Sequence, residues 1–226
     1  MTPSKSQVNK AGTALRRWAV GELADEGAYR DALSVLLAFR AAHKDPLTKA
    51  NMGLRSMVRT EGCRVEVSQR LKRVPTIIDK LTREPTMQLA NMQDVGGCRA
   101  VLGDVAELRR VQRRLIRNRP PLRMNDYITA PRDSGYRGMH VIVRYDDRAI
   151  EVQLRTRVMH AWAITVERLG GRLQTDLKSG RGPQPLLDLL EVISEAMALE
   201  EVGQVVDTNL MDRMTELRHK AVPWLR

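Results

Sequence analysis

Apolar residues recur at helical spacing through much of residues 11–60. The residues that share this spacing are Leu15, Trp18, Ala19, Leu23, Leu33, Leu36, Leu37 and Phe39. The pair Asp45-Pro46 interrupts the pattern, because proline lacks a backbone donor and restricts the residue before it. The pattern therefore predicts a long helical stretch that breaks at Asp45-Pro46, and then a second helix that ends near Thr60.

The pattern changes in the next segment of the chain. Val65 and Val67 alternate with polar residues, which is typical of a short strand. Pro75 is placed to open a helix that ends near Arg83. A strand and a helix are therefore predicted before the central part of the sequence begins.

A buried strand and an amphipathic helix are predicted in the centre. The run DVGGCRAVL is short and apolar, and it begins through Gly96-Gly97. The helix that follows covers residues 104–118, with Asp104 as its N-cap and Pro120-Pro121 as its stop signal.

Three further segments have the composition of strands, namely LRMNDYI, MHVIVRY and AIEVQLRT. The last two flank Asp146-Asp147 and predict a hairpin, and residues 157–169 then return to helical spacing. Strands that lie close in sequence and include a hairpin favour a mixed sheet over a doubly wound one. The predicted fold class is α/β of the α+β type, with a mixed sheet of about five strands flanked by helices.

The C-terminal part reads as helical. The polar stretch KSGRGPQP separates the core from an amphipathic helix, LLDLLEVISEAMALEEV, and a last helix covers about residues 207–220. We expect N-terminal helices over residues 1–62, a core over 63–172 and C-terminal helices over 173–226. The apolar side of the amphipathic helix is suited to packing on the core, to self-association or to a protein partner.

The charge balance points to an anionic partner. The 226 residues carry 38 Lys and Arg against 27 Asp and Glu, a net charge of +11. Aromatic residues make up only 4% of the chain, which argues against a broad surface that stacks on single-stranded bases. A merely soluble, arginine-rich surface is the alternative.

Several classes of protein are disfavoured by absent patterns. The sequence has no signal-peptide pattern, no apolar run long enough to span a bilayer, and two isolated cysteines, so we expect a cytoplasmic protein with free thiols. It has no P-loop, Rossmann or kinase signature and no Cys/His metal cluster. Any nucleotide chemistry must therefore come from another fold.

Two groups of charged residues could hold a nucleotide with a metal ion. Arg70, Lys72, Arg73 and Lys80 could contact a triphosphate, although a solvated basic helix is the alternative. Asp94 precedes the glycine-led strand, with Arg99 five residues later. A turn residue that satisfies local N–H groups is the alternative for Asp94.

The strand EVQLRT carries a third group. Glu151, Gln153 and Arg155 project from one face, since side chains alternate along a strand, while Val152 and Leu154 point into the core. Such a polar face favours a cleft. Together with Asp94, Glu151 would give the two carboxylates that a Mg²⁺–nucleotide site uses.

The loop APRDSGYRGMH lies between these groups. It places Tyr136 at its apex, with Arg132, Arg137 and His140 nearby. An exposed aromatic flanked by cations suits stacking on a base beside its phosphates. A tyrosine packed on the core is the alternative.

Four of these segments together resemble the synthetase domain of the RelA/SpoT family. They are RLKRVPTIIDKL, MQDVGGCRAVL, NDYITAPRDSGYRGMHVIV and EVQLRTRVMHAWA, in the order and spacing of that family over roughly residues 64–170. The resemblance implies a nucleotidyltransferase-like fold and a pyrophosphokinase. Such an enzyme transfers pyrophosphate from ATP to a ribose 3′-hydroxyl with Mg²⁺ as cofactor.

The resemblance also implies roles for individual residues. The residues expected to bind ATP are Arg70, Lys72, Lys80 and Arg99. Asp94 would hold Mg²⁺, and Glu151 would complete the metal site or act as a base. The residues expected on the acceptor side are Tyr136, which would stack on the base, and Arg132, Arg137, His140, Gln153 and Arg155.

The chain departs from the family pattern in places. Asn125 stands where a lysine usually precedes DYI, and Arg132 stands where lysine is frequent. No HD dipeptide occurs, so the hydrolase domain of the long members is not expected. The implied protein is a small, single-domain, synthetase-only member.

Small members that this chain resembles differ in their acceptor. Some make guanosine alarmones from GDP or GTP, some make adenosine alarmones, and some are toxins that modify the 3′ CCA end of tRNA and are often paired with an antitoxin. Arg109, Arg113 and Arg117 form a stripe on the helix 104–118, which together with the net charge favours tRNA. A solvated basic face is the alternative for this helix. A weakly catalytic module that binds RNA or a partner is a further alternative for the function. A homo-oligomer is an alternative for the state of assembly.

Overall fold

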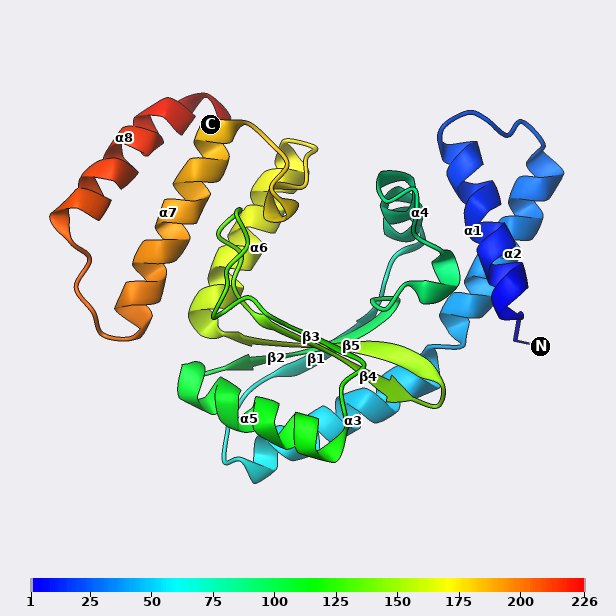
Figure 1. Ribbon diagram of the computed structural model, residues 1–226, viewed down its shortest axis with the longest axis horizontal. Coiled ribbons are helices and arrows are strands. Elements are labelled where there is room, and N and C mark those ends of the chain that lie inside the picture. Colours follow the sequence, from blue (N-terminus) through cyan, green and yellow to red (C-terminus); the bar gives the residue numbers. More distant parts are fainter. Residues whose placement is uncertain (1, 226) are drawn as a thin grey trace.

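The computed structural model describes residues 2–225, which fold around one five-stranded sheet in the order β1-β2-β5-β4-β3 (Figure 1). β2 and β5 run parallel and the other neighbouring pairs are antiparallel, so the predicted mixed sheet is confirmed. The strands are β1 (Val67–Leu71), β2 (Gly96–Leu102), β3 (Arg123–Asp126), β4 (Met139–Tyr145) and β5 (Arg148–Thr156).

Helices frame the sheet on both faces and at both ends. They are α1 (Lys5–Ala19), α2 (Glu26–Ala41), α3 (Lys44–Thr60), α4 (Val74–Arg83), α5 (Val105–Asn118), α6 (Arg157–Arg172), α7 (Gln184–Glu201) and α8 (Thr208–Leu225). Two short 3-10 helices are η1 (Leu89–Asn91) and η2 (Leu177–Ser179). No helix within residues 2–225 is both long and apolar enough to cross a membrane.

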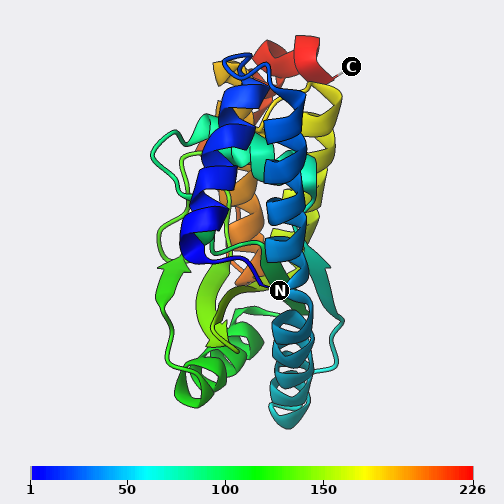
Figure 2. The same ribbon diagram turned by 90° about the vertical axis from the view of Figure 1, so that its right-hand side faces the viewer.

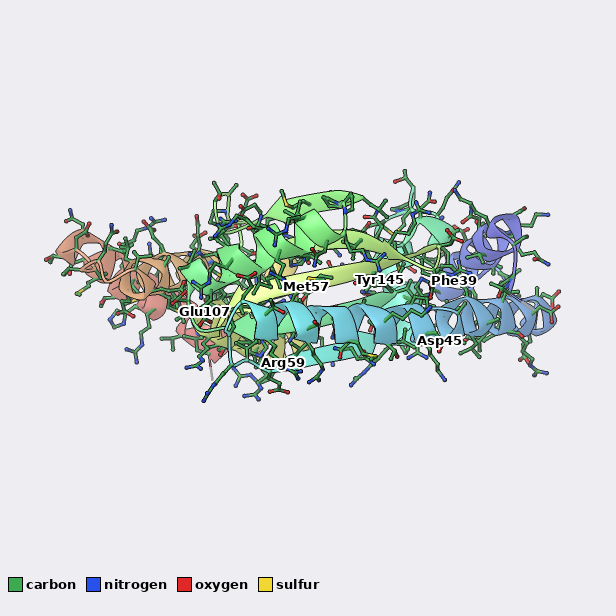
Figure 3. The ribbon with its side chains drawn as sticks, turned by 90° about the horizontal axis from the view of Figure 1, so that it is seen from below. Phe39, Asp45, Met57, Arg59, Glu107 and Tyr145 are labelled. Carbon is green, nitrogen blue, oxygen red and sulfur yellow. The ribbon has the colours of Figure 1, made fainter. Side chains whose placement is uncertain are left out.

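The main core lies on the lower face of the sheet in Figure 1. Alternation along β5 directs Val152 and Leu154 to this face, as predicted, and Cys98 of β2 joins them. α3 and α5 cover the face side by side, and Met57 of α3 points between them (Figure 3). Both cysteines are buried and unpaired, as expected.

The upper face lies between two helical walls (Figure 1). One wall is α4 with the pair α1 and α2, which lie side by side in Figure 2, and the other is α6 with the pair α7 and α8. Each wall has its own apolar cluster, centred on residues such as Leu36 and Ile77 in the first and Trp162 and Leu186 in the second. The polar residues of the strands therefore face the space between the walls.

Several predicted boundaries are confirmed by local contacts. Pro75 lies in the first turn of α4, which ends where expected. Asp104 caps α5, since its Oδ1 accepts a hydrogen bond from the Glu107 N–H at 2.7 Å. Asp146 and Asp147 have φ values of 44° and 61°, which is typical of a type I′ hairpin turn between β4 and β5.

The prediction of one long helix up to Asp45-Pro46 is wrong. α1 ends at Ala19, the chain turns at Gly21, and Asp25 then caps α2. Pro46 lies in the first turn of α3, where the helix has no intrahelical N–H bond to lose. Proline therefore helps to begin a helix here rather than to break one.

The turn at Gly135 places the loop of residues 127–138 directly against α7. Its φ is +81°, and a Cβ atom there would lie 2.8 Å from the Glu191 Cα and 3.0 Å from the Leu190 carbonyl oxygen. Ser194 donates a hydrogen bond to the Gly135 carbonyl at 2.6 Å. Main chain thus packs on main chain at this point, which leaves no space for a side chain.

We predict that Gly135→Ala lowers the free energy of unfolding by about 2–4 kcal/mol, because left-handed strain and the clash with α7 add. Gly203→Ala is the matched control. Gly203 has a φ of +74°, but a Cβ atom there would have no neighbour within 4 Å among residues 2–225, so the control should lose only about 1 kcal/mol. Urea unfolding followed by circular dichroism measures both losses. Equal losses would contradict the close packing of the loop on α7.

Candidate active site

The upper face of the sheet forms the floor of a cleft of about 1480 Å³. Its walls come from α4, from α6 with the segment that follows it, and from the loop of residues 127–138. A second hollow of about 870 Å³ lies between α1 and residues 85–89, and the residues described there include no carboxylate. Metal-dependent nucleotide chemistry is therefore assigned to the larger cleft.

One end of the cleft carries Asp94 between two lysines. The Lys72 Nζ lies 3.0 Å from Asp94 Oδ2, and the Lys80 Nζ lies 3.1 Å from Asp94 Oδ1. The Lys72 N–H also donates to the Val95 carbonyl at 2.8 Å, which joins the end of β1 to the segment that leads into β2. The structure thus brings together three residues that the sequence predicts for the phosphates and the metal.

Arg70 and Arg99 stand beside this cluster on the floor of the cleft. The Arg99 Nε is buried without a hydrogen-bond partner among residues 2–225. Burial, followed by the charges of Arg155 and Arg70, lowers the pKa of Arg99 from its ordinary value. The floor therefore holds a surplus of positive charge that an anion would balance.

The polar residues of β4 and β5 close into a ring of hydrogen bonds with the loop. The His140 Nδ1 lies 2.8 Å from Glu151 Oε1, and its Nε2 lies 2.5 Å from the Tyr136 hydroxyl. The Arg155 Nε donates to that hydroxyl at 3.2 Å, and its Nη2 donates to Gln153 Oε1 at 3.1 Å. The Gln153 Nε2 donates to Glu151 Oε2 at 2.6 Å and completes the ring.

One assignment of protons satisfies the whole ring. Arg155 can only donate and an ionised Glu151 can only accept, so the Tyr136 hydroxyl donates to His140 and the imidazole proton lies on Nδ1. Burial alone would raise the pKa of Glu151, but the hydrogen bonds from His140 and Gln153 outweigh burial and lower it. Burial lowers the pKa of His140. We therefore describe Glu151 as ionised and His140 as neutral at pH 7.

The prediction that Tyr136 is exposed at the loop apex is wrong, because its side chain is fully buried. The loop turns back onto α7, so the ring packs beside Trp162 with the centroids 6.3 Å apart. The Lys178 Nζ lies 4.8 Å from the ring centroid, and the guanidinium carbons of Arg155 and Arg132 lie 5.2 and 5.6 Å from it. Stacking of Tyr136 on an acceptor base stays a prediction.

Arg132 and Arg137 leave the loop in different directions. Arg132 lines the cleft, donates to the Tyr127 hydroxyl at 2.9 Å and lies 4.4 Å above the Tyr127 ring. Arg137 instead lies 3.3 Å from Glu201 at the end of α7, in a largely buried ion pair. The prediction that Arg137 faces the acceptor is therefore wrong, because this ion pair holds it outside the cleft.

The arginine stripe of α5 is only partly exposed. Arg109 lies 2.6 Å from Asp126, because α5 packs next to the end of β3, whereas Arg113 and Arg117 are exposed. α5 covers the face of the sheet opposite to the cleft (Figures 1 and 3). The stripe predicted for RNA therefore does not border the cleft.

Lys178 and Glu167 line the cleft and were not predicted from the sequence. The Lys178 Nζ lies 2.8 Å from Glu167 Oε1. Burial, and next the charge of Arg155, lower the pKa of Lys178 to about 8. Lys178 is the first residue of KSGRGPQP, whose composition is that of a linker, so no pattern in the sequence marked it.

The two carboxylates predicted for a Mg²⁺–nucleotide site line the same cleft. Asp94 and Glu151 both line it, and Glu151 is paired in register with Gly97, three residues after Asp94. Within residues 2–225 no group of three or more His, Cys, Asp or Glu side chains could hold a metal ion. Mg²⁺ commonly takes one or two carboxylates and completes its coordination with phosphate oxygens and water, so the pair fits a metal that arrives with a nucleotide.

Comparison with known proteins gives a consistent result. Residues 69–168 match the family described as a region found in RelA and SpoT proteins. GTP pyrophosphokinase YjbM of Bacillus subtilis is 28% identical over 153 residues, which cover 62% of this chain and 70% of the relative. GTP pyrophosphokinase YwaC of the same organism is 26% identical over 142 residues, which cover 56% and 65%.

A solved structure supports the fold. Small alarmone synthetase 1 from Bacillus subtilis, bound to its product pppGpp, superposes with a TM-score of 0.58 at 24% identity. The match covers 81% of this chain and 96% of that one. The two proteins therefore share their fold.

We predict that Lys178 titrates with a pKa of about 8, since burial and Arg155 disfavour its charged form. Glu167 raises this pKa, so Glu167→Gln should lower the Lys178 pKa further. NMR of ¹³C-methylated lysines measures both values, with Lys178→Arg used to assign the resonance. An unchanged or higher pKa in Glu167→Gln would contradict the ion pair.

Proposed function

We propose that this chain, which belongs to the RelA/SpoT synthetase family and is a pyrophosphokinase, transfers pyrophosphate from ATP to the 3′-hydroxyl of a guanosine di- or triphosphate, with AMP as the leaving group. The relatives YjbM and YwaC are named GTP pyrophosphokinases. The observation that carries the proposal is the pairing, in one cleft, of the Asp94–lysine cluster with the hydrogen-bonded ring around Glu151.

The Asp94 end of the cleft suits the donor. Lys72, Lys80 and Arg70 are cations at one edge of the sheet, where separate charge-assisted contacts could hold the three phosphates of ATP. Arg99 lies beside them, and its Nε has no hydrogen-bond partner within residues 2–225. Mg²⁺ held by Asp94 and Glu151 would neutralise charge on the transferred group. Positioning and charge neutralisation are the main demands of phosphoryl-type transfer.

We assign Glu151 to metal binding and to orientation of His140 rather than to proton abstraction. A general base is most effective when its pKa lies near the working pH, and the hydrogen bonds from His140 and Gln153 lower the pKa of Glu151 below its ordinary value. Both of its oxygens already accept hydrogen bonds, from His140 and from Gln153. Its ionised form is therefore available to a metal over the whole physiological pH range.

A tRNA acceptor, as used by a toxin of a toxin–antitoxin or phage-defence system, is the second candidate. Its support is the net charge of +11 and the exposed Arg113 and Arg117. The position of α5 across the sheet from the cleft weakens this candidate, since RNA bound along α5 would not thereby place its 3′ end in the cleft. An antitoxin and self-association stay predictions.

The acceptor is tested by competition. Purified protein with Mg²⁺ and ATP labelled at the γ-phosphate is offered GDP, GTP, ATP and deacylated tRNA together. We expect label on the guanosine nucleotides. Label on tRNA alone would replace this proposal with the tRNA-modifying toxin. A labelled adenosine nucleotide that carries a 3′-pyrophosphate, without labelled guanosine product, would indicate an adenosine alarmone.

We predict that Glu151→Gln lowers kcat by about 10²–10³-fold, because the neutral amide weakens the metal site and breaks the ring at His140. Label transfer measures the loss, and circular dichroism confirms the fold. Glu26→Gln is the matched control, since Glu26 is an exposed partner of Arg30 on α2, and it should keep full activity. Equal activity of the two variants would contradict the assigned site.

A further inference from the structure

The surroundings of Lys178 hold more positive than negative charge. Its Nζ pairs with Glu167, but Arg155 and Arg99 are close enough to disfavour its charged form. Arg155 is fully buried and its Nη1 has no hydrogen-bond partner within residues 2–225. Lys178 and Arg155 therefore place two cations at the Tyr136 ring, and one guanidinium nitrogen there lacks an acceptor.

The main chain holds Lys178 next to the loop of residues 127–138. The Lys178 carbonyl accepts a hydrogen bond from Ser134 Oγ at 2.8 Å, so the segment after α6 is joined to the loop that carries Tyr136. Figure 1 shows this segment on the side of α6 that faces α4. The side chain itself is 21% exposed and lines the cleft. The ammonium group can therefore turn from Glu167 to a ligand while its backbone stays in place.

A phosphate group matches this environment. It brings negative charge and several acceptor oxygens, which suit both a compact ammonium and the unpartnered guanidinium nitrogen. The donor phosphates would have their own cations at the Asp94 end of the cleft, namely Lys72 after β1 and Lys80 on α4. The charge surplus beside the loop is thus left for the other substrate.

We infer that Lys178 determines acceptor specificity by binding the 5′-phosphate groups of the acceptor nucleotide. The inference rests on the proposed function, because it names a contact of the same reaction. Lys178 would exchange Glu167 and the face of the Tyr136 ring for the phosphate, which also uncovers that ring beside the bound nucleotide.

The test compares Lys178→Met with Lys178→Arg, and uses Lys220→Met as the matched control. Lys220 is an exposed lysine of α8 that pairs with Glu216 outside the cleft. The measurements are kcat and KM with GDP and with guanosine as acceptors, and KM for ATP. Binding of GDP without ATP is measured in parallel by calorimetry.

For Lys178→Met we expect KM and Kd for GDP to rise about ten- to hundredfold, as for the loss of one charge-assisted contact. KM for guanosine and KM for ATP should change less than about twofold, since neither uses the lost contact. Lys178→Arg should keep most of the affinity for GDP, and Lys220→Met should match the wild type.

Two failures are distinguishable. The inference would be overturned if Lys178→Met left KM for GDP unchanged, or if it raised KM for GDP and KM for guanosine by the same factor. Either result would leave the pyrophosphokinase intact. Wild-type protein that neither binds nor uses GDP would overturn the proposed function itself.

Discussion

The ring of hydrogen bonds that joins Glu151, His140, Tyr136, Arg155 and Gln153 is the interaction on which the site depends. Glu151 is the buried anion of the ring and Arg155 is its buried cation. His140 and Tyr136 connect them on one side, and Gln153 connects them on the other. A buried charge without partners is strongly unfavourable, so each member is needed by its neighbours. The ring also fixes the orientation of the imidazole and the carboxylate before any substrate arrives.

Sheet topology makes this arrangement possible. The parallel pairing of β2 and β5 sets Gly97 next to Glu151, and a Cβ atom at Gly97 would lie 4.0 Å from the Glu151 carboxylate. A larger side chain there would fill the space between the Asp94 cluster and the ring. β4 pairs antiparallel with β5 and brings His140 opposite Gln153. The two residues that hydrogen-bond to Glu151 therefore lie at paired backbone positions. Rigid strands thus hold the polar groups, while a loop supplies only Tyr136.

Local signals in the sequence predicted most of this framework. The period of two along β5 identified the polar face, and Pro75, Asp104 and Asp146-Asp147 marked element boundaries through local chemistry. Such signals act within a few residues, so they are readable without the fold. The turn at Gly21 was missed because apolar residues on both sides keep helical spacing, and the periodicity concealed the break.

The errors in the site have a different origin, since each depends on contacts between distant segments. The burial of Tyr136 is decided by α6 and α7, and Arg137 is turned away by Glu201, which lies 64 residues later. Lys178 was hidden inside a stretch that reads as a linker.

These contacts reveal a division of charge within the cleft. Lys72 and Lys80 at the Asp94 end both pair with the carboxylate of Asp94, whereas Arg155 beside Tyr136 is fully buried and its Nη1 has no hydrogen-bond partner within residues 2–225. A buried N–H donor without an acceptor destabilises a fold unless a ligand completes it, so the free donor of Arg155 beside Tyr136 is best explained by an anionic substrate. The same donor that costs stability in the free protein would then supply affinity in the complex, because it is already in place and already stripped of water.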